Sequence, residues 1–154
     1  MHALPRIRPA LAAAALCLML TASAQAAVVT PIPGGVAVVD RTRADDRLTL
    51  GFPAPETVRV HSASGPLAMD ASLLTGHGGV ACRVVDAATV LCRPFDPKAG
   101  LRLRVNTGGG DDTVRFARPS TSKGGILAPT VDAGPGADVV VADGTIEGGP
   151  GDDV

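Results

Sequence analysis

The clearest pattern along the chain is a regular alternation of apolar and polar residues at positions 101–105. Leu101, Leu103 and Val105 would lie on one face of a strand. Arg102 and Arg104 would lie on the opposite face, towards solvent. Shorter apolar or alternating runs predict three further strands, at residues 36–39, 48–52 and 58–60.

Proline and glycine recur every few residues and oppose long helices. Only residues 67–74, bracketed by Gly65 and Gly76, could form a turn or two of helix. The sequence contains three Phe and no Tyr or Trp, so its apolar residues are mainly Ala, Val and Leu, which suit thin β layers. We therefore predict an all-β fold of short strands, arranged as a sandwich, a barrel or a parallel β-helix.

Two cysteines occupy a predicted hairpin formed by residues 80–85 and 89–93. Folding this segment about Ala87 places Cys82 opposite Cys92, and facing Cβ atoms of an antiparallel pair lie about 4.5–5.5 Å apart. That separation is close to the reach of a disulfide. A metal site with two cysteine ligands is the alternative, but no histidine lies nearby at ligand spacing. We predict a disulfide between Cys82 and Cys92.

The first 26 residues have the pattern of a secretory signal peptide. Arg6 and Arg8 precede an apolar run over residues 10–20, and Ala24 and Ala26 frame a small-x-small cleavage site. The run is shorter than the roughly 20 residues of a membrane-spanning helix, and no later segment approaches that length. We therefore expect a mature chain that begins at Ala27, has no membrane span, and is secreted, extracellular or bound to the cell surface.

Charge divides the mature chain into two regions. Residues 27–106, the predicted β-rich N-terminal region, carry nine basic and seven acidic residues. Residues 107–154 carry three basic and eight acidic residues. The acidic end argues against a nucleic-acid partner and is compatible with bound cations.

Glycine and aspartate recur in a fixed order within residues 107–154, where eleven of the 19 glycines lie. Three segments, residues 107–112, 133–138 and 148–153, share the order x-G-x-G-x-D. In the first two segments, an apolar residue, Val114 or Val140, follows two positions after the aspartate. Alternate glycines allow a tight coil that directs carbonyl oxygens inward, and the aspartate adds a carboxylate. This mixture of oxygens suits calcium, which takes six to eight oxygen ligands.

The repeated segments resemble the hemolysin-type (RTX) calcium-binding nonapeptide repeat, G-G-x-G-x-D-x-U-x, of secreted actinobacterial proteins. The resemblance implies that the hairpin leads into a parallel β-helix or β-roll. It also implies that loop carbonyls and aspartates bind calcium between successive coils. By position, the implied carboxylate ligands are Asp112, Asp138 and Asp153. The implied loop positions are Gly108, Gly110, Gly134, Gly136, Gly149 and Gly151.

The spacing of these repeats is irregular. Asp112 and Asp138 are 26 residues apart, and Asp138 and Asp153 are 15 apart, so neither interval is a multiple of nine. An irregular insert is expected at residues 116–130, and the array is expected to continue beyond Val154. Asp45 and Asp46, which follow two nearby arginines, are expected in a solvated turn rather than in a paired-carboxylate site.

No catalytic motif is apparent in the sequence. H-E-x-x-H, G-x-S-x-G and the phosphate-binding glycine loops do not occur, and His61 and His77 are isolated. The leading hypothesis is an extracellular calcium-binding structural or binding module whose protein or carbohydrate partner is unknown. One alternative is the export and folding region of a secreted enzyme whose catalytic domain lies beyond residue 154. Another is a cation-independent β-helix that serves as an adhesin or scaffold.

Overall fold

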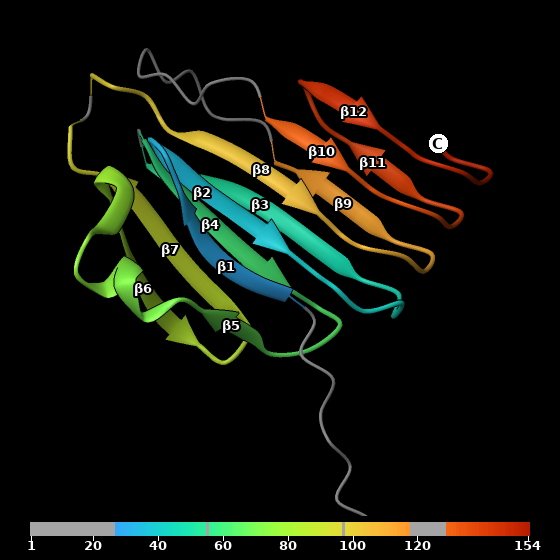
Figure 1. The fold of residues 1–154 in the computed structure, drawn as a ribbon, viewed down its shortest axis with the longest axis horizontal. Helices are drawn as coiled ribbons and strands as arrows, with labels where there is room; N and C mark the ends of the chain where they lie inside the picture. Colours follow the sequence, from blue (N-terminus) through green and yellow to red (C-terminus); the bar gives the residue numbers. More distant parts are fainter. Residues whose placement is uncertain (1–26, 55, 97, 118–128) are drawn as a thin grey trace, which may run out of the picture.

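The computed structural model describes residues 27–54, 56–96, 98–117 and 129–154, which form two mixed six-stranded sheets. The predicted signal peptide lies outside these residues, as does most of the expected insert at 116–130. In the first sheet the order of strands is β12-β10-β8-β2-β1-β5. In the second sheet it is β11-β9-β3-β4-β7-β6, and the two sheets face each other as layers (Figure 1).

The strands are short, as the frequent glycines and prolines predict. Those of the first sheet are β1 (Ala27–Ile32), β2 (Gly35–Val39), β5 (Leu67–Met69), β8 (Arg102–Asn106), β10 (Thr130–Asp132) and β12 (Thr145–Glu147). Those of the second sheet are β3 (Arg47–Ala54), β4 (Thr57–Ser62), β6 (Val80–Asp86), β7 (Thr89–Pro94), β9 (Thr113–Phe116) and β11 (Val139–Val141). Two 3₁₀ turns, η1 (Ala71–Leu74) and η2 (His77–Gly79), precede β6.

The second sheet separates antiparallel from parallel pairing, whereas in the first sheet the antiparallel pair of β1 and β2 lies between parallel pairs, because β1 also runs parallel to β5. Strands β3, β4, β7 and β6 are joined by antiparallel pairs, as are β1 and β2. Towards the C-terminal strands both sheets are parallel. Strands β2, β8, β10 and β12 run parallel in the first sheet, and β3, β9 and β11 do so in the second sheet. The parallel strands come in successive pairs, because β2, β8 and β10 of the first sheet lead into β3, β9 and β11 of the second sheet. The chain therefore crosses between the layers at the same end each time (Figure 1).

The core lies between the two sheets and consists mainly of valine and leucine. Val38, Leu50, Val60, Val90 and Val105 are fully buried, and they come from five different strands. Alternation explains this arrangement, because successive side chains of a strand point to opposite faces. In β8 the prediction is confirmed residue by residue: the apolar residues are buried and both arginines are exposed.

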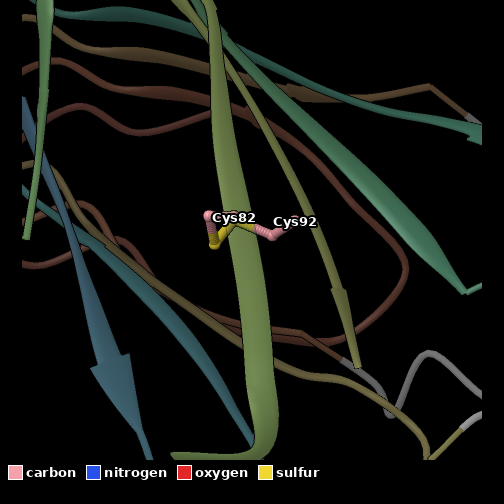
Figure 2. The surroundings of a disulfide bond; sticks show 2 residues. All are labelled: Cys82 and Cys92. Carbon is pink, nitrogen blue, oxygen red and sulfur yellow. A yellow bond between two sulfur atoms is a disulfide. The ribbon is translucent and has the colours of Figure 1, made fainter. Parts of the chain in front are cut away.

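The predicted hairpin and disulfide are both confirmed. Cys82 of β6 pairs with Cys92 of β7 in the antiparallel register, and their sulfur atoms are bonded at 2.07 Å (Figure 2). Both cysteines are buried, so the bond ties the hairpin together on its core side. The turn contains only Ala87 and Ala88, because β6 extends to Asp86, one residue further than the sequence indicates.

The strands expected at residues 36–39, 48–52, 58–60 and 101–105 are β2, β3, β4 and β8. The sequence did not indicate β1, β10 or β12. Residues 67–74, expected to form a turn or two of helix, instead form β5 followed by η1, whose first turn is capped by the Asp70 side chain. No helix in the described ranges is long and apolar enough to cross a membrane.

Candidate cation site formed by stacked glycine and aspartate loops

Four loops lie side by side at the end of the molecule where the chain crosses between the sheets (Figure 1). They comprise residues 40–46, 107–112, 133–138 and 148–153, and we call them the loop stack. The last three contain the glycine and aspartate repeats identified in the sequence. The first is not a copy of the repeat, but it makes the corresponding connection, from β2 to β3.

The irregular spacing of the repeats does not disturb the stacking. Strand pairing places Val105 beside Val131. In the loops, the hydroxyl of Thr107 donates to the carbonyl of Ala133. The two residues of each pair are 26 positions apart in the sequence. The interval of 15 residues likewise places Thr130 beside Thr145 in neighbouring parallel strands. The extra residues of the longer interval therefore lie between β9 and β10, outside the loop stack.

Glycine is required where the loops are in closest contact. Gly134 has a φ of 82°, and a Cβ atom added to it would lie 1.8 Å from the carbonyl oxygen of Gly108. Gly149 has a φ of 92°, and its Cβ would lie 2.0 Å from the carbonyl oxygen of Gly134. Both the left-handed backbone and the close approach exclude side chains at these positions. The stacking of bare backbone therefore accounts for the glycines of the repeat.

One aspartate from each loop joins a continuous column. The backbone N–H of Asp46 donates to Oδ1 of Asp112 at 2.7 Å, and that of Asp112 donates to Oδ1 of Asp138 at 2.8 Å. The N–H of Asp138 in turn donates to Oδ1 of Asp153 at 3.2 Å. We call these four residues the aspartate column. The carboxylates of Asp112, Asp138 and Asp153 thus tie their own loops to the preceding ones.

The second carboxylate oxygen of three column members has no partner. Oδ2 of Asp46, Asp112 and Asp138 is buried and accepts no hydrogen bond. The three residues are at most 1% exposed. Burial without a partner is costly for a carboxylate, which normally protonates, pairs with a cation or binds a metal.

The pKa values of these carboxyl groups reflect that cost. Burial raises the pKa of Asp46 to about 7, although a hydrogen bond from Ser64 acts in the opposite direction. Burial likewise raises the pKa of Asp112, and the nearby charge of Asp138 adds to this effect. The pKa of Asp138 is also raised, first by burial and then by its acidic neighbours. Burial and neighbouring acidic groups therefore disfavour the charged form of all three carboxyl groups, and nothing in the loops offsets this effect completely.

A divalent cation fits the chemistry of this column in one respect. The buried, unpartnered oxygens are the hard ligands that calcium prefers. In the same loops, backbone carbonyls such as that of Gly110 lie against the glycines of the neighbouring loop. However, no three Asp, Glu, His or Cys side chains of the described residues come together as a ready-made metal site. A cation here would therefore need carbonyl oxygens as well as carboxylates.

The residues implied by the RTX resemblance are brought together, but they are not equivalent. Asp112 and Asp138 are buried in the column, whereas Asp153 lies at its exposed end. The glycines all have positive φ angles and occupy matching positions in the three repeat loops: Gly108, Gly110, Gly134, Gly136, Gly149 and Gly151.

The expectation of a solvated turn at Asp45 and Asp46 was wrong for Asp46. Asp45 is exposed, but Asp46 is fully buried and begins the aspartate column. A local signal was present in the sequence. Asp46 stands two positions before the buried Leu48, as Asp112 stands two positions before Val114.

Asp40, in the same loop as Asp46, is also buried, but both of its carboxylate oxygens are used. One accepts backbone N–H groups of Arg41 and Thr42, and the other accepts the Thr42 hydroxyl. The non-repetitive loop is thus stabilised by its own side chains rather than by glycines.

Neither a protein-family model, nor a curated protein, nor a solved structure gives a significant match to the chain. The resemblance to the RTX repeat therefore rests on the repeat residues themselves.

Proposed function

We propose that this protein is an exported calcium-binding module whose loop stack is held together by calcium ions. The aspartate column and the adjoining loop carbonyls would supply the ligands. The disulfide, which is typical of exported proteins, supports a location outside the cytoplasm. In this proposal the parallel strands and their loops form coils of a β-roll.

The observation that carries the proposal is the row of buried carboxylate oxygens without partners. Asp46, Asp112 and Asp138 each leave Oδ2 unpaired while Oδ1 or the backbone joins the neighbouring loop. Native proteins leave few such atoms, and an unseen ion is one of the standard explanations. The repeated glycine and aspartate order supports the same interpretation from the sequence alone.

Within this proposal each residue type has a separate task. Asp112 and Asp138 would contribute carboxylate oxygens, and Asp46 would do the same for the first loop. The glycines allow the neighbouring loops to approach closely enough for carbonyl oxygens to complete the coordination. Bound calcium would supply the positive charge that offsets repulsion between successive carboxylates.

Calcium titration of the purified exported protein, after treatment with a chelator, tests the proposal. If calcium binds the folded protein alone, a concentration 100 times Kd adds about 2.7 kcal/mol of stability. The Tm should then rise on the order of 10 °C, with a measurable heat of binding. Magnesium should have a smaller effect, because it demands stricter octahedral geometry and keeps its water. An unchanged Tm and no heat of binding would contradict the proposal.

Two variants separate ligand loss from general damage. Asp138→Asn keeps an oxygen that can accept the N–H of Asp112, but it removes the charge. It should lose most of the rise in Tm with calcium while remaining as stable as the wild type in chelator. Asp143→Asn, an exposed carboxylate between β11 and β12, is the matched control and should keep the full response.

A cation-independent scaffold is the second candidate, and two observations favour it. No preformed cluster of three metal-binding side chains exists among the described residues. Hydrogen bonds also join the loops directly, through Oδ1 at every step of the column. This candidate predicts the same melting curve in calcium and in chelator.

A further inference from the structure

Arginine gathers on the outer face of the second sheet, on the side away from the core. Five adjacent strands, β6, β7, β4, β3 and β9, each place one exposed arginine there. We call these five arginines the arginine face; in the order of the strands they are Arg83, Arg93, Arg59, Arg47 and Arg115. Each stands next to buried residues in its own strand, so alternation directs it outward.

The register of the strands brings three of these arginines together. Arg83 and Arg59 stand on either side of Leu91, in the two strands that flank β7. Arg93 lies two positions further along β7, on the same face as Leu91. Alternate strands are about 10 Å apart, so flexible side chains from these positions can reach a common ligand. A pocket of about 350 Å³ lies here, lined by Arg83, Arg93, Leu91 and Thr57 among others.

Arginines outnumber acidic residues on this face. Asp86, which pairs with Thr89 at the end of the β6–β7 hairpin, shares the face, whereas Asp46, next to Arg47 in the sequence, is buried. The outer face of the first sheet is different. There Arg102 and Arg104 share the surface with Asp132 and Glu147 of neighbouring parallel strands. A sheet face with one arginine per strand over five strands spans about 19 Å, enough for several charges of an extended polymer.

We propose that the arginine face binds an acidic polysaccharide. A guanidinium group matches carboxylate or sulfate oxygens with paired hydrogen bonds, and threonine hydroxyls between the arginines suit a polyhydroxylated chain. Thr57, Thr49 and Thr113 occupy such outward positions. The inference is independent of the proposed calcium site, which lies at the end of the sheets.

Nucleic acid fits this face less well. Single-stranded nucleic acid is held by stacking of bases on aromatic side chains as well as by charge. The aromatic residues of these strands, Phe52 and Phe116, pack against the core instead of facing outward. A sheet face with arginines and without outward-facing Phe, Tyr or Trp in these strands therefore favours a polymer that carries its charge on sugar rings.

Binding to heparin and to polygalacturonate, which carry sulfate and carboxylate groups respectively, tests the proposal in chelator at low salt. The purified exported protein should bind at least one of them, and neutral dextran should not bind. Arg59→Ser/Arg83→Ser should raise Kd at least tenfold. It should also reduce the slope of log K against log salt by about 2. Arg102→Ser/Arg104→Ser removes the same charge from the other sheet, and it should change Kd less than twofold.

Three results would overturn the proposal. The first is absence of binding to both polysaccharides at low salt. The second is an equal loss of affinity in the two double variants, because binding would then depend on net charge rather than on this face. The third is binding of a single-stranded DNA oligonucleotide as tight as that of the polysaccharides. Equal Tm values for the wild type and the two double variants exclude misfolding as the cause of weaker binding. An unchanged Kd for the polysaccharide in Asp138→Asn shows that binding at the arginine face does not depend on the calcium site.

Discussion

The two sides of this molecule are stabilised by different means. In the hairpin region, formed by β4, β6 and β7, antiparallel strands bury valines such as Val60, Val80 and Val90 completely, and the Cys82–Cys92 bond joins two of the strands. In the loop stack, the contacts are backbone on backbone and carboxylate on backbone. Apolar burial dominates the first region and polar contacts dominate the second.

The contrast is strongest in the last strands. Val140 of β11 is only partly buried, and Ile146 of β12 is 43% exposed. Little apolar area is thus available there to offset the entropy of ordering glycine-rich loops. The same loops bury carboxylate oxygens, which adds a cost instead of a gain. We infer that the loop stack depends on solution conditions in a way that the hairpin region does not.

The largest expected effect comes from filling the space between two stacked loops. In Gly134→Val, the new Cβ would meet the carbonyl of Gly108 at 1.8 Å, and a β-branched residue would have to adopt a φ of 82°. Backbone strain and overpacking together should cost about 4 kcal/mol or more. Chemical denaturation should show this loss, and hydrogen exchange should show faster exchange in β10, β11 and β12 than in β6 and β7.

Gly51→Ala is the matched control in the second sheet. A Cβ added to Gly51 meets no atom within 4 Å, and φ is not positive there. Alanine should therefore be neutral or stabilise the protein by up to about 1 kcal/mol. If Gly134→Val were tolerated equally well, the loops would not be stacked as described.

The next effect concerns pH in the absence of divalent cations. The pKa of Asp46 is raised from 3.8 to about 7 in the folded protein, first because of burial. Between these values the unfolded chain has lost the proton and the folded protein keeps it. The free energy of unfolding should therefore fall as pH rises from about 4 to about 7, by at most about 4 kcal/mol. The raised pKa values of Asp112 and Asp138 act in the same direction.

Asp46→Asn should reduce this pH dependence, because asparagine does not bind or release a proton in this range. Asp70→Asn makes a useful contrast: the pKa of Asp70 is lowered by its hydrogen bonds to Ser72, and its carboxylate is exposed. That variant should leave the fall between pH 4 and pH 7 in place. Urea denaturation at a series of pH values measures the stability of both variants and of the wild type. A stability that rises over this pH range in the wild type would exclude a buried, unneutralised column.

Several parts of the fold could be predicted from the sequence, because their signals are local. The alternation in residues 101–105 identified β8 of the first sheet, and the spacing of Cys82 and Cys92 about Ala87 identified the disulfide of the hairpin region. The glycines and aspartates of the repeat loops were also identified. In each case a short segment carried enough information by its own period or composition.

The remainder depends on contacts between distant segments. Parallel pairing of β2 with β8 joins residues that are 67 positions apart, such as Val36 and Leu103, and no local pattern specifies it. Asp46 was missed because its loop lacks the glycines of the repeat, so its position two residues before Leu48 was too weak a signal without the contact to Asp112. Strands β10 and β12 have three residues each, too few to show a period.

The smallest of the three effects, and the one confined to the hairpin region, is loss of the disulfide. Closing a loop of this length contributes somewhat less than about 3 kcal/mol in the chain-entropy model. Cys82→Ala/Cys92→Ala should lower stability by about that amount and accelerate hydrogen exchange in β6 and β7. The loop stack lies away from this bond, so exchange in β10 to β12 and any rise in Tm with calcium should be unchanged. Reduction of the wild-type protein is the matched treatment and should reproduce both results. Equal loss of protection in β12 and β7 would mean that the two regions unfold as one unit, and the division between an apolar side and a loop-dependent side would then be wrong.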